Sequence, residues 1–408
     1  MLGGIVLLVV TGVVSFAIID ALKRKYRFVD APFLKNLFVY HTFLAIAYFL
    51  YVMFNPSDSK AYYTKVLSDF RGDTWMSFYG TSTTFIEFLA YPLIRYLGFS
   101  YESMMVLFSF LGFLGFVYMY LLFKEHVQFS HQFMGMDLVK FIFLLPNLHF
   151  WSSSLGKGSV IFLGIGLFFF GIRKVNSRIL ATVLGGVIIY HVRPHIMLVL
   201  LVSSALGFIF SSKGVSMAMR FVFLLGSCIA FFFIYRDVLS LVNINEDEFI
   251  SQGLDLTHRA SELSKATSGV DITNYSLPVQ VFTFLFRPLF FDAPGALGLV
   301  VSVENVIYLI LAAKILNLRG LRFLIRGDFM VKSAFLSFIS VSIALAQISG
   351  NLGLAMRQKS QVMILFLFVI TVFLDRERAN YRRPRVRPQR PADDAPSGAP
   401  APSIGNNV

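Results

Sequence analysis

The stretch FLKNLFVYHTFLAIAYFLYVMF (residues 33–54), followed directly by NPSDSKAYYTKV (residues 55–66), decides the fold class. The first part is mainly apolar and is long enough, as a helix, to cross a hydrocarbon core of about 30 Å. The second part is polar and opens with an Asn-Pro pair, which favours a turn. We therefore expect a membrane-spanning helix that reaches a membrane surface near residue 55.

The composition extends this expectation to the whole chain. Of its 408 residues, 56% are hydrophobic and 14% are charged, and the mean hydropathy is +0.69. A soluble core of this size could not bury so much apolar surface, so we predict an all-α fold, a polytopic transmembrane helical bundle. The net charge of +13 does not indicate nucleic acid, because the basic residues lie between apolar runs and in one tail.

Apolar runs predict about eleven spans within a membrane domain of residues 1–376. Two long outer loops are expected at residues 55–100 and 236–295, and a basic, Pro-rich tail at residues 377–408 is expected to be disordered. Residues 2–22 are interpreted as a retained helix rather than a signal peptide. The expected spans are 2–22, 33–54, 101–123, 138–151, 158–172, 179–192, 195–211, 220–235, 296–313, 331–348 and 361–374.

The distribution of Lys and Arg predicts the orientation of these spans. With eleven crossings, most basic loops and the basic tail fall on one side, which the positive-inside rule assigns to the cytoplasm. The amino terminus is then outside and the carboxyl terminus is cytoplasmic. Residues 83–99 and 277–291 mix apolar residues with charges and proline, which favours helices that lie in the membrane interface.

Basic residues recur at the predicted outer ends of spans. They are Lys157, Arg193, Arg287 and Arg357. The positive-inside rule disfavours cations there, so an anionic ligand is a simple explanation, and guanidinium and ammonium groups both bind phosphate oxygens. In the alternative interpretation, each cation pairs with a local acid such as Glu102, Asp292 or Glu304, or extends to lipid headgroups.

Asp58 lies at the outer end of the second span, close to Tyr62 and Tyr63. Its carboxylate could accept a proton from a sugar hydroxyl, which is general-base catalysis, and the tyrosines could contact the sugar or acceptor. The alternative is structural, because Asp is also favoured in turns and as a helix cap. Asp69, Asp73 and Glu87 are rival acids in the same loop.

Histidines near the same face do not complete a metal site. His191 and His195 are separated by Pro194, which spoils helical i,i+4 geometry, and no acid or cysteine completes a ligand set. We predict no metal site and no cofactor; a divalent cation stays open as an alternative that nothing in the sequence supports. His195 is a candidate phosphate or acceptor contact. No phosphate-binding glycine loop, Ser-His-Asp set or dinucleotide motif occurs in a suitable context.

Several motifs together resemble bacterial membrane proteins of the GT-C glycosyltransferase superfamily, of the envelope-polysaccharide type. The motifs are PSDSKAYYTKV, LPNLHFWSSSLGKGSVIFLGIGL, YHVRPHI, FLFRPLFF and NLGLAMRQKS, within residues 33–374. The resemblance implies a helical bundle with an acidic base in its first outer loop. It places Asp58 at that acid and Lys157, Arg193, Arg287 and Arg357 around the donor phosphate. Many members have two adjacent acids, whereas Asp58 is followed by Ser59.

We therefore hypothesise a membrane glycosyltransferase in the bacterial cytoplasmic (inner) membrane, active in polysaccharide biosynthesis of the cell envelope. It would move a sugar from a polyprenyl-phosphate or diphosphate donor to a glycan, lipid or protein acceptor at the outer face. One alternative is a polymerase of polysaccharide repeat units. An alternative of another class is a transporter or flippase of lipid-linked glycan, which would commonly show internal repeats. The expected partners are the donor, the acceptor and membrane lipid.

Overall fold

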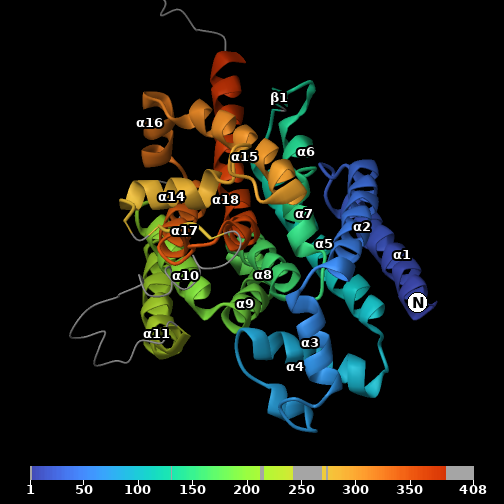
Figure 1. Ribbon diagram of the computed structural model, residues 1–408. Coiled ribbons are helices and arrows are strands. Elements are labelled where there is room, and N and C mark those ends of the chain that lie inside the picture. The colour runs from blue at the N-terminus through green and yellow to red at the C-terminus, as the bar shows by residue number, and fades with distance from the viewer. Residues whose placement is uncertain (1, 130, 212–215, 242–268, 273, 383–408) are drawn as a thin grey trace, which may run out of the picture.

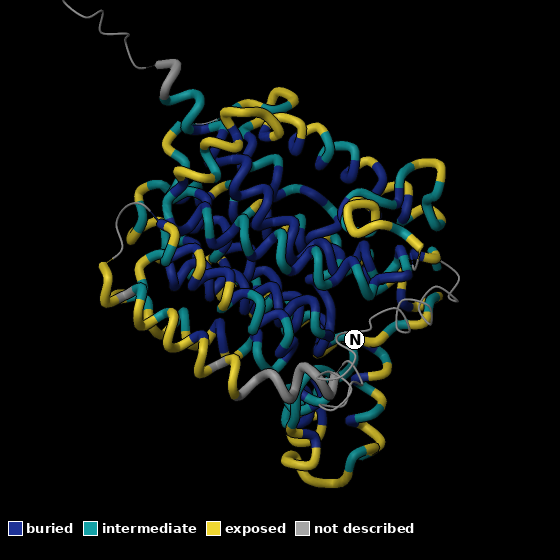
Figure 2. The backbone as a smooth tube through the Cα atoms, turned by 90° about the vertical axis from the view of Figure 1, so that its left-hand side faces the viewer, coloured by how far each residue is buried: buried dark blue, intermediate teal, exposed yellow. Residues whose placement is uncertain are grey.

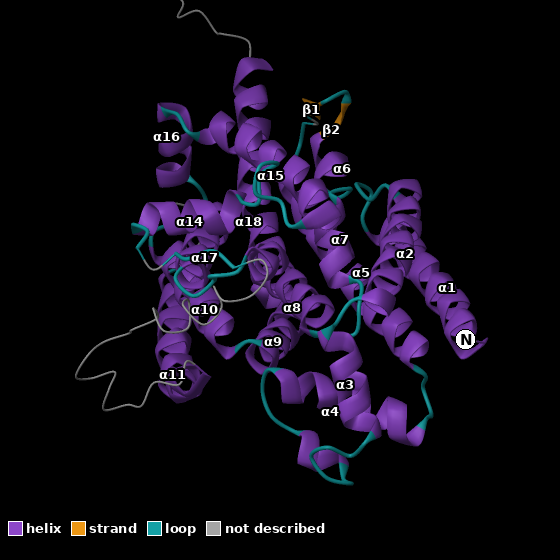
Figure 3. Cartoon of the chain, in the orientation of Figure 1, coloured by secondary structure: helices purple, strands orange, loops and turns teal. Residues whose placement is uncertain are grey.

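Helices account for nearly all of the regular structure in the computed structural model (Figure 1). The structure describes residues 2–129, 131–211, 216–241, 269–272 and 274–382. Within these ranges the named strands form one short antiparallel hairpin, β1 (Gln132–Phe133) and β2 (Met136–Asp137) (Figure 3). The predicted helical class is therefore confirmed.

The helices begin and end as follows in chain order. They are α1 (Leu2–Lys25), α2 (Ala31–Phe54), α3 (Asp58–Leu67), the 3₁₀-helix η1 (Trp75–Phe78), α4 (Thr83–Tyr91), the π-helix η2 (Pro92–Tyr96), α5 (Tyr101–His126), α6 (Leu138–Ile142), α7 (Pro146–Ser152), α8 (Lys157–Ile172), α9 (Val175–Val192), α10 (Pro194–Ile209), α11 (Met217–Leu241), α14 (Leu277–Phe286), α15 (Gly295–Ile315), α16 (Leu318–Arg326), α17 (Phe329–Ala346) and α18 (Leu352–Arg382).

Six of the described helices are long and apolar enough to cross a membrane. They are α1, α2, α5, α9, α15 and α17, and the pair α7 and α8 adds a seventh if that bent pair is one span. Every expected span overlaps a helix, but the predicted number of eleven is not confirmed. The range 138–151 falls on two short helices, α6 and α7, because Pro146 begins a new helix and cannot continue the previous one.

Local sequence signals explain where the long helices begin. The Asp30 carboxylate accepts a hydrogen bond from the Phe33 N–H at the start of α2, and Asp328 caps α17 in the same way. At α3 the cap is Ser57, whose hydroxyl accepts from the Ser59 N–H. Asp58 is thus the first residue inside α3 rather than its cap, and its side chain is available for other contacts.

Nearly all residues of helix α8 are buried. Figure 2 shows that buried backbone gathers in the middle of the molecule. Glycines permit its close packing: Gly164 lies against the backbone of Gly185 in α9, and Gly166 lies against that of Gly115 in α5. Small residues allow helix backbones to approach closely, which favours van der Waals packing where the hydrophobic effect between helices is weak. The sequence GSVIFLGIGL therefore produces a core helix with the end at Lys157 held in a fixed position.

Charged side chains gather at the two ends of the bundle. At the end shown uppermost in Figure 1, Arg319 of α16 pairs with Glu377 of α18 at 3.3 Å, and Arg376 pairs with Asp328 at 2.9 Å. Helices α3 and α4 lie at the opposite end. The basic residues 314–326 and the C-terminal part of α18 thus share one end, in agreement with the prediction that most basic loops and the basic tail lie on one side. That this end faces the cytoplasm stays a prediction.

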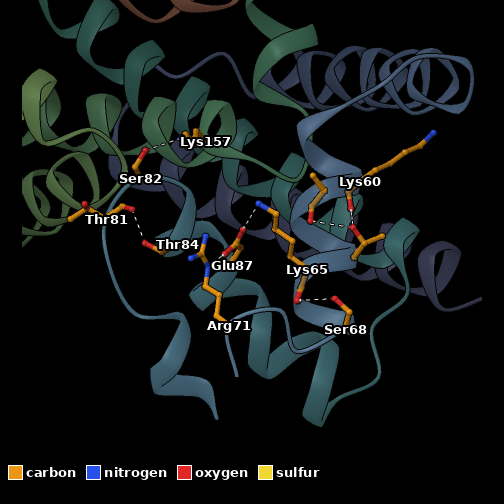
Figure 4. A network of polar contacts seen from close by, with 11 residues as sticks. Lys60, Lys65, Ser68, Arg71, Thr81, Ser82, Thr84, Glu87 and Lys157 are labelled. Atoms are coloured by element: carbon orange, nitrogen blue, oxygen red, sulfur yellow. Dashed lines mark hydrogen bonds and ion pairs between the residues drawn. The ribbon is translucent and has the colours of Figure 1, made fainter. Parts of the chain in front are cut away.

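Residues 55–100 form a lobe at the other end of the bundle. In this lobe Glu87 of α4 is fully buried, and its carboxylate pairs with Arg71 at 2.5 Å and lies 3.9 Å from the Lys65 ammonium (Figure 4). The predicted helix over residues 83–99 is present as α4 and η2, with the change of helix type at Pro92. Part of the second predicted outer loop, residues 242–268, and most of the predicted tail lie outside the described residues.

The two ends of the bundle predict opposite membrane sides for two reporter positions. A topology reporter fused after residue 380 is expected to report the cytoplasm, and one inserted after Gly72, in the exposed turn of the lobe, is expected to report the outside. Alkaline phosphatase and green fluorescent protein fusions give complementary signals for this measurement. A cytoplasmic signal from the lobe, or an external signal after residue 380, would contradict the predicted orientation.

Candidate functional site

A sharp break between α7 and α8 positions Lys157. The two helices meet at 112°, and the intervening residues 153–156 are buried. Serine hydroxyls donate hydrogen bonds to backbone carbonyl groups beside the break. Ser152 donates to Leu148 O at 2.7 Å, and Ser159 donates to Ser154 O at 2.9 Å. Gly158 is required here because a Cβ would collide with the Trp151 carbonyl oxygen. The break therefore begins α8 at Lys157, facing the lobe.

Lys157 connects α8 to the lobe through Ser82 (Figure 4). Its ammonium donates to the Ser82 hydroxyl at 2.8 Å, and the Ser82 N–H donates to the His191 carbonyl at the end of α9 at 2.6 Å. Ser82 has a positive φ of +63°, a conformation that costs a non-glycine residue about 1–3 kcal/mol. These contacts hold Ser82 in that conformation and join the lobe to α8 and α9.

Asp58 and Arg357 form an ion pair although they are 299 residues apart. The Arg357 Nη1 atom lies 2.5 Å from Asp58 Oδ2, and the Asp58 side chain is 57% exposed. Arg357 is in the second turn of α18, so the pair joins the start of α3 to the start of α18. The Arg357 side chain is only 22% exposed, so the pair is partly buried on the arginine side. A phosphate is an alternative anionic partner that could compete with Asp58 for this guanidinium.

Further charges surround this ion pair. Arg193, Arg357 and Asp58 all act electrostatically on Lys157, and the two arginines oppose its positive charge whereas Asp58 favours it. Arg193 is buried at the turn between α9 and α10, where Pro194 begins a new helix. Mutual repulsion of like charges is reduced when an anion binds between them. The group of Lys157, Arg193 and Arg357 is therefore suited to an anionic ligand.

Tyr62 lies beside the same charges, in the second turn of α3. Burial, together with the nearby Asp58 carboxylate, raises the pKa of Tyr62 to about 12, although Arg357 acts in the opposite direction. Its phenol is therefore protonated at neutral pH and serves as a neutral hydrogen-bonding group. Tyr62 does not titrate in the physiological range, so it does not serve as a base.

The Asp58–Arg357 pair lies in the walls of two cavities. The larger cavity has a volume of about 920 Å³ and is lined by the ends of α2, α7, α15 and α18 and the start of α3. Its aromatic side chains are Tyr48, Tyr51 and Trp151. The smaller cavity, about 10 Å³, is lined by Lys157 and Tyr62 as well and has room for about one water molecule. Asp58 is thus positioned between a roomy cavity and Lys157.

Other predicted site residues lie in different surroundings. Arg287 pairs with Asp292 at 2.5 Å, which agrees with the alternative interpretation of a local acid partner. The Tyr63 hydroxyl donates to the Phe99 carbonyl at 3.2 Å, and its ring packs against Tyr101. His195 is half-buried in the first turn of α10. The structure therefore groups Asp58, Lys157, Arg193 and Arg357, and gives Arg287 and Tyr63 other partners.

Sequence reasoning missed a buried polar network behind the site. Lys359 is fully buried in α18 and donates to Arg287 O at 2.7 Å and to Asn305 Oδ1 at 2.8 Å. Asn305 in turn donates to Pro288 O at 2.6 Å. The signal in the sequence was a lysine only two residues after Arg357, directly before the last apolar run. The network fixes the chain that leads from α14 to the cavity wall at the start of α15.

Within the described ranges, no group of three or more His, Cys, Asp or Glu side chains is arranged to hold a metal ion. Asp58 has Arg357 as its partner and Glu87 has Arg71, so these carboxylates are engaged with cations. The chemistry that the site offers is therefore one carboxylate next to several cations.

The close approach at Gly158 predicts a strong effect of a single methyl group. Gly158→Ala should lower the unfolding temperature by several degrees and disturb the position of Lys157, because the new Cβ meets backbone that cannot move freely. Gly226→Ala in α11 is the matched control, since a Cβ there meets nothing within 4 Å. Thermal unfolding in detergent measures both, and equal unfolding temperatures would contradict the assigned break geometry.

No protein-family model, no curated protein and no solved structure matches the chain.

Proposed function

We propose that this chain is an integral-membrane glycosyltransferase that moves a sugar from a polyprenyl-phosphate or diphosphate donor to a glycan, lipid or protein acceptor. One observation carries the proposal: Asp58 and Arg357, which are far apart in sequence, pair in the wall of a cavity of about 920 Å³. Lys157 and Arg193 lie near enough to this pair for the charges to act on one another. The resemblance of the sequence motifs to GT-C glycosyltransferases supports the same reaction. The proposed location is the outer face of the bacterial cytoplasmic membrane.

In this proposal the cations bind the phosphate that leaves the sugar. As the bond between the anomeric carbon and the phosphate oxygen breaks, negative charge increases on the phosphate, and fixed cations stabilise that charge most in the transition state. Arg357 offers a planar fork for phosphate oxygens and Lys157 offers a compact charge. A phosphate that takes Arg357 as its partner also releases the Asp58 carboxylate from its ion pair.

Asp58 is then the general base in the proposed reaction. Its carboxylate accepts the proton of the acceptor hydroxyl while the hydroxyl oxygen bonds to the anomeric carbon, and the bond electrons of the donor leave with the phosphate. The cavity beside Asp58 gives the acceptor access, and Tyr48, Tyr51 and Trp151 provide rings on which a sugar can stack. These aromatic residues replace Tyr63 as the proposed sugar contacts from this part of the chain.

A transporter of lipid-linked glycan is the second candidate, and buried charges favour it. Glu304 and Lys359 are buried in α15 and α18, and ionisable residues inside membrane helices often mark transport pathways. However, both have fixed partners: Glu304 accepts from the Asn147 N–H at 2.6 Å and the Tyr308 hydroxyl at 2.9 Å, and Lys359 holds Asn305. This arrangement favours a structural role, so the transferase remains our proposal.

Asp58→Asn is expected to reduce sugar transfer by about 100-fold or more, because the amide keeps the shape of the side chain but cannot accept the proton. The measurement is release of polyprenyl phosphate or diphosphate from lipid-linked sugars in reconstituted membranes. Asp69→Asn is the matched control, since Asp69 pairs with Arg95 elsewhere in the lobe. Normal turnover by the Asp58 variant, with wild-type folding, would exclude Asp58 as the base.

Arg193→Ala is expected to weaken binding of polyprenyl phosphate by roughly tenfold or more, because a hydrogen bond to a charged group is worth about 1.5–3 kcal/mol. Arg287→Ala is expected to leave this affinity nearly unchanged, since the Arg287 guanidinium pairs with Asp292. Native mass spectrometry with added polyprenyl phosphate measures both variants. An equal loss in both would mean that Arg287 also binds the phosphate, and no loss in Arg193→Ala would remove it from the site.

A further inference from the structure

Two histidines form a buried pair in the interior of the bundle, away from the candidate site. His41 lies near the middle of α2 and His149 lies in α7, and both are almost completely buried. Their Nδ1 atoms are 2.8 Å apart. This is the distance of a hydrogen bond between two nitrogen atoms, so one hydrogen must lie between them.

The other nitrogen of each ring faces a backbone carbonyl. His41 Nε2 lies 3.0 Å from Ser109 O, and His149 Nε2 lies 2.7 Å from Phe143 O. A carbonyl oxygen only accepts hydrogen bonds, so each Nε2 atom must carry a hydrogen. A flip of either ring would place carbon atoms at both contacts and lose both hydrogen bonds, which fixes the orientation of the rings.

The hydrogen count of the pair then exceeds that of two neutral imidazoles. A neutral imidazole has one N–H group, and in each ring that group is already used at Nε2. Without a further proton, two nitrogen lone pairs would face each other at 2.8 Å in a dry environment. We propose that His41 and His149 bind one shared proton between their Nδ1 atoms, which makes the pair a proton-binding site with a single positive charge.

Burial destabilises the positive charge of the pair, because the charge loses its hydration. Neighbouring groups stabilise the charge and reduce this cost. The Phe116 ring of α5 stacks on His149 with centroids 3.9 Å apart and planes 4° apart, so its π face contacts the shared charge. The charge is also spread over two rings and stabilised by two carbonyl groups. α5 further contributes the Phe113 ring and the Ser109 carbonyl, neither of which titrates.

Titratable groups face the pair from the other helices. The Tyr40 ring of α2 packs edge-on against His149 at 5.0 Å, and the Tyr40 hydroxyl donates to Leu144 O. From α15, Glu304 accepts from the Asn147 N–H, two residues before His149, and its charge also acts on Tyr40. From α18, Lys359 acts on Glu304. Among these groups, Glu304 is the carboxylate, and it contacts α7 at Asn147, two residues before His149.

The proton would connect the interior of the bundle to the candidate site. It joins α2 to α7, and α7 leads through the break to Lys157 at the start of α8. Loss of the proton at alkaline pH would leave two lone pairs in contact and weaken the attachment of α7. This property does not depend on the proposed glycosyl transfer, because it follows from the hydrogen count alone.

Solid-state NMR of the full chain in bilayers, with ring-¹⁵N-labelled histidine at about pH 7.5, tests the shared proton directly, because exposed histidines are mostly neutral there. The variant is His149→Asn, whose amide can donate to the bare Nδ1 atom of a neutral His41. With a shared proton, the substitution removes two protonated nitrogen signals and no unprotonated signal. With a neutral pair, it removes one signal of each kind, and this result would overturn the proposal.

His131→Asn is the matched control for this measurement, since His131 lies next to the hairpin and outside the pair. It should remove one protonated and one unprotonated signal, as expected for an ordinary neutral histidine. If His149→Asn fails to fold, His41→Asn is measured in its place, and the same change in protonated and unprotonated nitrogen signals is expected. Thermal unfolding supplies a second readout: the wild type should lose stability between pH 7 and 9 relative to His149→Asn, and parallel curves would contradict the proposal.

Discussion

The requirement that backbone polar groups be satisfied inside a membrane constrains the break between α7 and α8. A helix that stops in an apolar layer leaves carbonyl and N–H groups without partners, each at a cost of several kcal/mol in hydrocarbon. Here Ser152 and Ser159 donate to carbonyls beside the break, and Glu304 accepts from the Asn147 N–H at the start of α7. Because these groups are satisfied, the chain can turn by 112° and present Lys157 at the end of a buried helix.

The charged side chains around the break between α7 and α8 are arranged in two ways. In the interior, Glu304 and Lys359 have short, fixed contacts to neutral groups and join α7, α15 and α18. Removal of a partner would leave such a buried group without a hydrogen bond, at a cost of about 1–3 kcal/mol or more. At the end of the bundle, Asp58 is 57% exposed and Arg357 is 22% exposed, so the Asp58 carboxylate can leave the pair for water. The first arrangement suits a rigid support, and the second suits a site that must bind and release a ligand.

The sequence predicted most of the helices but little of their breaks. Hydropathy locates a long apolar run such as α2. In such a run, the transfer of apolar side chains to lipid dominates the free energy that places the segment in the membrane. The range 138–151 also has the composition of a span, yet Pro146 and the packing of His149 against His41 divide it. Such divisions depend on contacts between segments that are distant in the sequence. The periodicity of one segment carries no information about these contacts.

The candidate site could be predicted only in part for the same reason. Asp58, Lys157, Arg193 and Arg357 were each visible as charges next to apolar runs, and the structure brings them together. Arg287 had the same local pattern, but Asp292 lies five residues later and pairs with it. The Tyr48, Tyr51 and Trp151 side chains of the cavity wall look like ordinary apolar residues in the sequence. Their shared position in the cavity wall becomes visible only when the ends of α2 and α7 lie side by side.

The starts of α3, α15 and α18 at this cavity give a further reason to expect an anion there. The first turn of a helix carries N–H groups without intrahelical partners and a partial positive charge. At α15 and α18 the first residues, including Gly295 and Gly353, line the cavity directly. Asp58 at the start of α3 and a bound phosphate would then be drawn to the same positive surroundings and to the same Arg357. Because only one of them can take that guanidinium fully, binding of the proposed phosphate would be coupled to release of the Asp58 carboxylate by charge alone.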